Sequence, residues 1–442
     1  SRLWRNSAGL DLAPTGGVQL RFDVTSVRDL RDYGDSTTMG LITQQASKTL
    51  FGRDIGFERQ RVVGTLLAVT PRGPAWLRPR ATVSSTFALT RDPNASRAAR
   101  DSAGAFHLPT SFSNGQRVDL GAQLDVGGLG RRLLPDSGVL ARALAWITPV
   151  DASVSRTLTS VYSQTAVTPS FGYQLALGGL EGLRSEAGVL ATSASRATNL
   201  ALAGGLALPL RLRLRVGYQQ AQGLTWVLRN DAQVPIRTRS LDWPSLGATW
   251  SVTPGGAVGR LLTSVTLQAN YREREAQNEQ RSVAGGTNLS RTRDQNLAPS
   301  IALTWRGGIL TSFDVVASDN EQLLAGNLFR NSRDQHNASV SFAFPSPLRV
   351  TRTPGIIRTT ARYSIAQQTT CLHSRGQAAC VPYVDSRQDD AQLTLDTSLS
   401  PNLSAGLQMA YVVNEERQAN RKVAQLLITA FFSLTASVGQ FR

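Results

Sequence analysis

Few side chains in this sequence have the type and spacing that catalysis or metal binding requires. The three histidines, His107, His336 and His373, form no cluster with cysteine or aspartate at metal-ligand spacing. Motifs for a serine nucleophile, a phosphate-binding loop or a zinc protease are absent from the sequence. We therefore expect no enzymatic activity, no catalytic residue, no metal site and no cofactor.

The two cysteines, Cys371 and Cys380, stand nine positions apart in a segment rich in Gln, Ser, Gly and Pro. A pair at this spacing, in a chain otherwise free of cysteine, fits a disulfide that closes a short loop in an oxidising compartment. Two unrelated thiols are the alternative. The spacing excludes a redox motif of the C-x-x-C type.

Arginines alternate with apolar residues in two segments. Arg211, Arg213 and Arg215 are interleaved with leucines, so an extended strand would place the two residue types on opposite faces. Arg358 and Arg362 are placed in the same way in a later run. If the apolar face meets lipid, these five arginines project into a lumen and favour anionic or polar cargo. Alternatively, they neutralise inward-facing acidic residues and hold a loop or plug.

The elements that carry these side chains are indicated by period-two alternation, which recurs along the chain and predicts β-strands. The clear runs are 118–126, 171–177, 210–219, 246–252, 265–271, 301–305, 338–344, 357–365, 393–399, 405–413 and 426–438. Weaker runs are 18–25, 61–70, 80–90, 153–163, 198–208, 223–230 and 309–317. One such strand also suits a soluble sandwich, but roughly sixteen to eighteen of them predict an all-β fold, an antiparallel transmembrane β-barrel.

The segments between these runs differ in length. We expect long loops at 91–117, 272–296 and 367–388 and a tight turn at 400–402, an asymmetry typical of outer-membrane barrels. Aromatic residues near the strand ends are consistent with an interfacial girdle, namely Trp76, Trp226, Trp250, Trp305, Tyr363 and Tyr411.

One region departs from the alternation. Leu140, Ala143, Leu144 and Ile147 recur at intervals of three and four, which predicts a short helix near 137–147, with Asp136 and Ser137 placed to cap it. A strand over 139–147 is the alternative.

The composition narrows the class of protein. Of 442 residues, 41% are hydrophobic and 18% are charged, and no stretch approaches the ~20 apolar residues of a membrane-spanning helix. The formal net charge of +16 invites a nucleic-acid function, but the basic residues are spread along the chain without a basic tail or RNA-binding signature. Only Lys48 and Lys422 are lysines, a skew towards arginine that is typical of GC-rich genomes. We expect no nucleic-acid partner.

Several short blocks resemble a known family. They are residues 28–35 (RDLRDYGD), 54–60 (DIGFERQ), 76–79 (WLRP) and 241–244 (LDWP) leading to Trp250. These blocks are similar to the C-terminal region of SprA-like cell-surface proteins, very large outer-membrane barrels. The resemblance implies a translocon of the type IX secretion system, and a chain that is the C-terminal portion of a longer polypeptide.

Together these observations predict one transmembrane β-barrel region over residues 1–442, in the bacterial outer membrane and part of a larger barrel. Its expected partners are outer-membrane lipid, the barrel-assembly machinery, other secretion-system subunits and secreted proteins. The final strand is similar to an outer-membrane assembly signal, with Phe432 and Phe441 near the end, although Arg442 is last. The expected function is part of a protein-secretion translocon, and the alternative is a stand-alone porin or transporter for small, preferentially anionic solutes.

Overall fold

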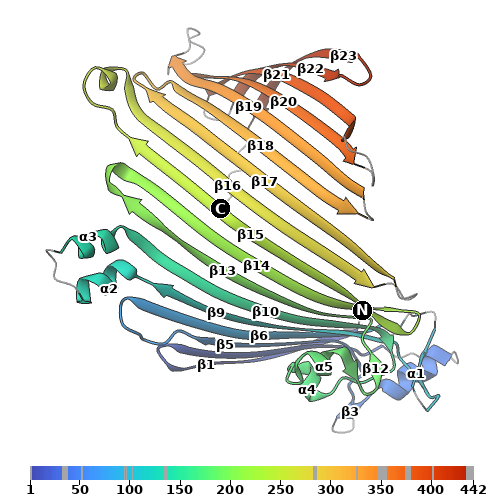
Figure 1. Ribbon diagram of the computed structural model, residues 1–442. Helices are drawn as coiled ribbons and strands as arrows, with labels where there is room; N and C mark the ends of the chain where they lie inside the picture. Colours follow the sequence, from blue (N-terminus) through green and yellow to red (C-terminus); the bar gives the residue numbers. More distant parts are fainter. Residues whose placement is uncertain are drawn as a thin grey trace. The chain divides into compact units, whose positions relative to one another are not determined.

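The computed structural model divides the chain into two compact units (Figure 1). Unit 1 comprises Ser1–Ala203, Gln219–Leu241 and Gln277–Leu289, and unit 2 comprises Gly204–Tyr218, Asp242–Ala276 and Ser290–Arg442. The structure describes residues 2–31, 38–50, 53–93, 95, 97–101, 103–133, 138–281, 286–324, 327–345, 356–373, 380–400 and 403–434.

In these described ranges, seventeen strands belong to one antiparallel sheet, which confirms the expected all-β fold and strand number. The first six lie in unit 1: β1 (Leu3–Thr15), β2 (Val18–Asp29), β5 (Phe57–Val69), β6 (Leu77–Arg91), β9 (Thr110–Leu124) and β10 (Ile147–Thr165). Each pairs antiparallel with the next in this order, as a meander does.

The remaining strands of this sheet are β13 (Ser193–Leu208), β14 (Leu212–Arg229), β15 (Ala232–Val252), β16 (Leu262–Arg281), β17 (Thr287–Trp305), β18 (Leu310–Leu324), β19 (Asn327–Pro345), β20 (Ile356–His373), β21 (Val381–Ser400), β22 (Leu403–Glu416) and β23 (Arg421–Leu434). From β17 to β23, each strand pairs antiparallel with its successor. Because sequence neighbours pair, the meander needs only hairpin connections.

Short elements occupy the connections. They are the helices α1 (Thr38–Ala46), α2 (Val126–Leu133), α3 (Val139–Ala145), α4 (Phe171–Gln174) and α5 (Gly179–Arg184), the 3-10 turns η1 (Pro209–Arg211) and η2 (Val258–Arg260), and three small hairpins, β3 (Thr49–Leu50) with β4 (Arg53–Asp54), β7 (Ala99–Arg100) with β8 (Phe106–His107), and β11 (Ser185–Glu186) with β12 (Val189–Leu190). Within the described ranges, no helix is long and apolar enough to cross a bilayer.

The main hydrophobic core lies in unit 1, where the α4–α5 segment covers one face of the strands. Tyr173 and Leu183 from this segment pack with Phe87, Phe112 and Tyr162 of the sheet, and all five are almost fully buried. Phe112 stacks on Tyr162 at 4.5 Å between ring centroids, and Tyr173 meets both rings edge-on. The segment is therefore fixed to the sheet by tertiary packing rather than by its own short helices.

The helices of the structure correct one expectation about the elements, agree with another and add one that was not expected. The predicted strand at 171–177 is wrong, because α4 forms there and Tyr173 is buried in the core. The predicted helix near 137–147 forms as Val139–Ala145, whereas Asp136, Ser137 and residues 435–438 of the predicted last strand lie outside the described residues. Helix α2 was not expected from the sequence.

The expected long loops at 272–296 and 367–388 are largely strand. β16 continues to Arg281 and β17 begins at Thr287, while β20 continues to His373 and β21 begins at Val381. Both faces of these strand ends are polar, so the alternation disappears from the sequence although backbone pairing continues.

Candidate functional site

One face of the unit 2 strands carries an apolar band, defined here by two cross-strand rows of directly paired residues. The first row, from β17 to β23, is Ile301, Phe313, Ala338, Tyr363, Ala391, Tyr411 and Leu426. The second is Leu303, Thr311, Val340, Ala361, Leu393, Met409 and Ile428. Residues paired directly across strands share a face, and several of these are largely exposed, such as Phe313 at 46% and Leu426 at 62%.

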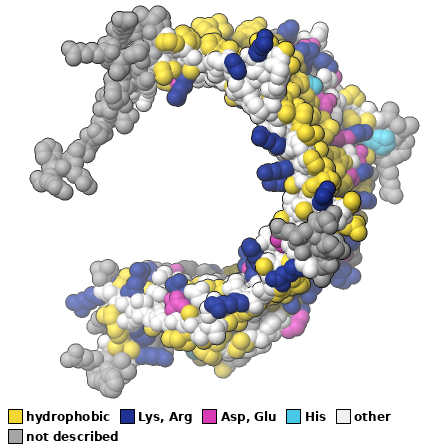
Figure 2. All heavy atoms as spheres, turned by 90° about the vertical axis from the view of Figure 1, so that its left-hand side faces the viewer, with side chains coloured by type: hydrophobic (Ala, Val, Ile, Leu, Met, Phe, Trp, Pro, Cys, Tyr) yellow, Lys and Arg dark blue, Asp and Glu magenta, His cyan; other side chains and the backbone are white. Residues whose placement is uncertain are grey.

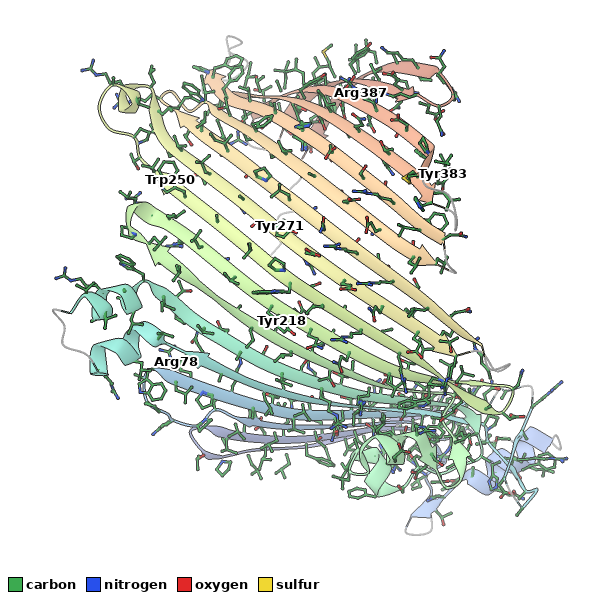
Figure 3. All side chains as sticks on the ribbon, viewed as in Figure 1. Arg78, Tyr218, Trp250, Tyr271, Tyr383 and Arg387 are labelled. Atoms are coloured by element: carbon green, nitrogen blue, oxygen red, sulfur yellow. A yellow bond between two sulfur atoms is a disulfide. The ribbon has the colours of Figure 1, made fainter. Side chains whose placement is uncertain are left out.

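Aromatic residues lie on the preceding strands of unit 2, β14 to β16 (Figure 3). Trp250 lies near the end of β15, whereas Tyr218 and Tyr271 lie farther along β14 and β16. From Leu262 to Tyr271, β16 advances about 30 Å, which a strand tilt of about 40° reduces to a height of about 23 Å. That height is close to the apolar band of a membrane barrel, about 25 Å.

Beyond Tyr271 the same face becomes charged. We call the pairs Glu273–Arg293, Glu275–Arg291 and Asp319–Arg330 the charged extension. The Arg293 guanidinium lies 2.7 Å from the Glu273 carboxylate, and the Tyr271 hydroxyl donates to Glu273 at 3.1 Å. Ion pairs that remain partly exposed belong in water, so the polarity of this face changes sharply within a few residues of each strand.

The opposite face of the same strands is a polar wall. Across β17 to β21 its paired residues are Ser300, Asp314, Asn337, Ser364 and Asp390, followed by Ala302, Ser312, Ser339, Arg362 and Gln392. The Asn337 amide donates to Asp314 at 2.6 Å, and the Ser312 and Ser339 hydroxyls are 2.7 Å apart. These four side chains satisfy one another across strands, as side chains of a wall that meets water can.

The structure distributes the predicted lumen arginines unevenly. Arg358 and Arg362 are exposed on the polar wall, at alternate positions with Ser364 on β20. Arg213 and Arg215 are exposed on β14, and Arg215 lies beside Gly247, on the face shared with Asn270. Arg211 is not on a strand: Pro209 begins the turn η1, and Leu210 and Arg211 both have positive φ angles, so the predicted strand starts at Leu212 instead.

Arg362 lines a polar cavity of about 220 Å³ that the sequence did not reveal. Arg333, Gln335 and Asp390 contribute to it from the neighbouring strands β19 and β21. Gln335 links the strands by donating to Ser364 at 3.4 Å. The residues meet only because β19, β20 and β21 pair in register, so no short-range sequence signal identifies them.

A second feature missed from the sequence is the buried carboxylate of Asp242. It is 8% exposed and forms ion pairs with Arg272 and with Arg274, the latter at 3.6 Å. Asp242 belongs to the block 241–244, which the family resemblance singled out without giving a role to this residue. Its two arginines come from the next strand, β16, where the sequence alternation suggested only a loop.

In unit 1 the strands divide in the same way. Val18, Val69, Ala81, Leu120 and Val154 form an apolar row from β2 to β10. On the opposite face, Arg21 pairs with Asp23 at 2.6 Å and Arg117 pairs with Asp119 at 2.7 Å. Both units therefore place an apolar row on one face of the sheet. The opposite face carries ion pairs in unit 1 and hydrogen-bonded polar side chains in unit 2.

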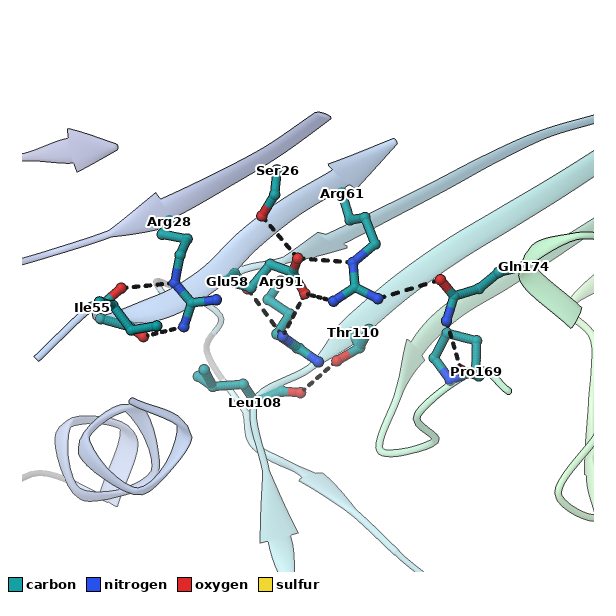
Figure 4. Close-up of polar contacts among 11 residues, drawn as sticks. Ser26, Arg28, Ile55, Glu58, Arg61, Arg91, Leu108, Thr110, Pro169 and Gln174 are labelled. Carbon is teal, nitrogen blue, oxygen red and sulfur yellow. Dashed lines mark hydrogen bonds and ion pairs between the residues drawn. The ribbon is translucent and has the colours of Figure 1, made fainter. Parts of the chain in front are cut away.

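At the far ends of the unit 1 strands, the Glu58 carboxylate collects several donors (Figure 4). Glu58 is 8% exposed; it accepts from Ser26 at 2.9 Å and from Arg61 at 2.8 and 2.7 Å, while Arg91 lies 3.7 Å away. Arg61 also donates to Gln174 of α4 at 3.3 Å. This network fastens the α4–α5 segment to the strand ends, and it borders a cavity of about 470 Å³.

Two blocks of the resemblance meet in this region. The Arg28 guanidinium donates to the carbonyl oxygens of Ile55 and Gly56 at 2.7 and 2.6 Å, and Asp29 pairs with Phe57 in the sheet. Nearby, hydrogen bonds from Ser47 and from the Gly56 amide lower the pKa of the Asp54 carboxyl. The Asp54 carboxylate thus stays charged, and its hydrogen bonds hold Ser47 and Gly56 together in the connection between β2 and β5.

The remaining chemical candidates are few. Cys371 and Cys380 are joined by a disulfide with 5.6 Å between their Cα atoms, at the end of the β20–β21 pair. Among the residues that the structure describes, no group of three or more His, Cys, Asp or Glu side chains comes together to hold a metal ion. His107 bonds to Asp101 at 2.8 Å, and His336 pairs with Ile365 on the sheet.

The basic side chains on the face shown in Figure 2 do not form one continuous patch. On the face shown in Figure 2, Lys and Arg side chains are scattered among larger apolar areas. Many of them pair with a nearby carboxylate, as Arg387 does with Asp389 at 3.1 Å. A nucleic-acid surface would instead present a basic patch or stripe.

Comparisons with known proteins do not assign this chain to a family. No protein-family model matches the chain, and no curated protein matches it. Nine chains of solved structures match, among them one from "Structure of the FpvAI-pyocin S2 complex", with a TM-score of 0.33 and 8% sequence identity. That match covers 95% of this chain and 65% of the other, so this chain spans less than two thirds of its length. At this level of similarity the match carries no argument about function.

Proposed function

We propose that this chain forms the wall of a transmembrane β-barrel in a bacterial outer membrane. The observation that carries the proposal is the division of the same strands into an exposed apolar band on one face and a hydrogen-bonded polar wall on the other. In water, an exposed apolar band six or more strands wide is unfavourable, whereas lipid would cover it. The polar wall would then face an aqueous lumen.

The cargo that suits this wall is polar and preferentially anionic. Arg358 and Arg362 are exposed on it and form no ion pair among the described residues, so their charge remains available to a passing solute. Rings of unpaired arginine favour anions in a pore. The proposed activity is therefore passage of polar solutes with a preference for anions.

Planar-bilayer recording of the purified chain tests this proposal. We expect stable conductance with anion preference, and a clear loss of that preference in the double variant Arg358→Ser with Arg362→Ser. Arg330→Ser, on the opposite face of β19, is the matched control and should leave the selectivity unchanged. Absence of conductance, or a selectivity that the double variant does not alter, would contradict the proposal.

A protein-secretion translocon similar to the type IX system is the second candidate. It is favoured by the contact between two of the SprA-like blocks, since Arg28 holds the backbone of Ile55 and Gly56. A translocon must admit folded or folding proteins, whereas a small-solute porin excludes large polymers. Conductance in the presence of neutral polymers of increasing size separates the two: continued entry of large polymers supports the translocon, and early exclusion supports the porin.

A further inference from the structure

A cavity of about 350 Å³ in unit 1 brings together three arginines without acidic partners. Arg196 of β13 and Arg237 and Arg239 of β15 line it, and each is exposed. None of the three forms an ion pair within the part of the chain that the structure describes. Glu279 carries the single carboxylate among the lining residues, so the cavity has an excess of positive charge.

The cavity adjoins apolar surface along one strand. Ser195 and Asn199 of β13 contact Thr159 and Ser155 at 2.6 and 3.5 Å, which fixes one face of the strand. Arg196, Thr198 and Leu200 therefore alternate on the other face. Thr198 still lines the arginine cavity, whereas Leu200, about 7 Å further on, already lines a different cavity.

This second cavity is apolar and has a volume of about 430 Å³. Val69, Ala81, Leu120 and Val154, which belong to the apolar row of unit 1, line it together with Leu200. A cationic cavity and an apolar groove thus follow one another on the same face of β13. Their combined chemistry matches an amphiphile with an anionic head and a hydrocarbon chain.

We propose that these two cavities bind one phosphate-bearing membrane lipid, with the phosphate on Arg196, Arg237 and Arg239 and an acyl chain in the apolar groove. Guanidinium groups bind phosphate oxygens through paired, charge-assisted hydrogen bonds, and a phosphate monoester carries enough charge to engage more than one of them. The inference rests on the proposed function, because the groove meets an acyl chain only if the apolar face lies in lipid.

Native mass spectrometry of the detergent-purified chain tests the site. The probes are dioleoyl phosphatidic acid, dioleoylglycerol, which has the same chains and no phosphate, and inorganic phosphate. We expect phosphatidic acid to be retained at least about tenfold more tightly than dioleoylglycerol, and excess inorganic phosphate to displace it poorly. Changing Arg196, Arg237 and Arg239 together to Gln should remove most of this preference.

Two matched variants locate the site. Arg117→Gln, on the opposite face of the same unit, should bind phosphatidic acid as the native chain does. Leu200→Asn should weaken retention of phosphatidic acid without changing the binding of inorganic phosphate. Equal retention of the two lipids, equal loss in Arg117→Gln and the triple variant, or full displacement by inorganic phosphate would overturn the lipid site.

Gel mobility of the same preparation, measured with and without heating, tests the proposed function separately from the lipid site. A native chain that shows no heat-dependent shift in gel mobility is not a folded barrel, and that result contradicts the proposed function together with the lipid site. A heat-modifiable native chain without lipid preference contradicts the lipid site alone. Heat-modifiability of each variant, measured alongside, shows that its lost binding is not lost folding.

Discussion

Individual arginines in this protein differ in role according to their partners. Arg61 is engaged by the buried Glu58 carboxylate, so its charge holds the ends of neighbouring strands and the α4 segment together. Arg196 and Arg362 line cavities without an acidic partner among the described residues, and their charge remains available for a ligand. Leaving a buried carboxylate unpaired costs several kcal/mol, whereas exposed arginine is solvated and carries no such penalty.

At the scale of the residue, Asp101 makes the β7–β8 hairpin dependent on pH. The hydrogen bond from the His107 ring, followed by that from the Ala105 amide, lowers the pKa of the Asp101 carboxyl. A carboxyl whose pKa is lower in the folded chain stabilises it above the unfolded value of about 3.9, and this stabilisation is lost as the pH falls through the folded value. The protection of the Gly104 and Ala105 amides against hydrogen exchange, taken relative to the intrinsic exchange rate at each pH, should therefore decrease on acidification below about pH 4.

Asp101→Asn provides the control for this prediction. The variant side chain cannot ionise, so the Gly104 and Ala105 amides should already be less protected at neutral pH, and their protection should change little further on acidification. Identical exchange in the variant and the native chain at neutral pH would show that the carboxylate does not hold the hairpin.

At the scale of the element, the α4–α5 segment depends on the sheet for its conformation. Its helices span four and six residues, too short to be stable alone, and their apolar side chains are buried against β6, β9 and β10. Burial also raises the pKa of the Tyr173 hydroxyl, which keeps it neutral as it bonds to Ser160 at 2.6 Å. Packing and this hydrogen bond therefore hold the α4–α5 segment against the strands.

Truncating the core of this segment should release it. Leu183 is 1% exposed, and Leu183→Ala should cost about 2–4 kcal/mol through lost burial and the cavity left behind. Tryptic cleavage after Arg184, which is normally held by Gln233 and by Trp226, should then become faster. Leu177→Ala in the same segment is the control, since Leu177 is 72% exposed and its change should have almost no effect. Equal cleavage rates in the two variants would contradict this account.

At the scale of the whole molecule, the same division of polarity recurs in both units. In each, an apolar row crosses several strands on one face, and ion pairs or hydrogen-bonded side chains occupy the other. A soluble sheet with both faces in water has no reason to keep an exposed face apolar over so many strands. The division of polarity therefore favours an environment in which the apolar face lies away from water.

Adjacent positions on β16 allow a direct test of that environment. Leu267 belongs to the apolar face and Gln268 to the polar one, and both are exposed. If the apolar face lies in lipid, Leu267→Arg should destabilise the folded chain in vesicles by about 2–4 kcal/mol, whereas Gln268→Arg should be tolerated. Urea unfolding in lipid vesicles measures the difference, and equal stability of the two variants would argue against a membrane location.

The sequence by itself determined most of the strands and their faces. Side chains in a strand alternate with a period of two residues, and apolar runs such as Val265, Leu267 and Ala269 show this directly. The run 171–177 alternates in the same way but forms helix α4. It did not reveal the strand ends beyond Tyr271, where both faces are polar, nor the turn at Leu210 and Arg211. Only the tertiary structure decided which arginines are paired. Those contacts join residues far apart in the chain, as Arg293 joins Glu273, and they depend on strand register, which no local pattern encodes.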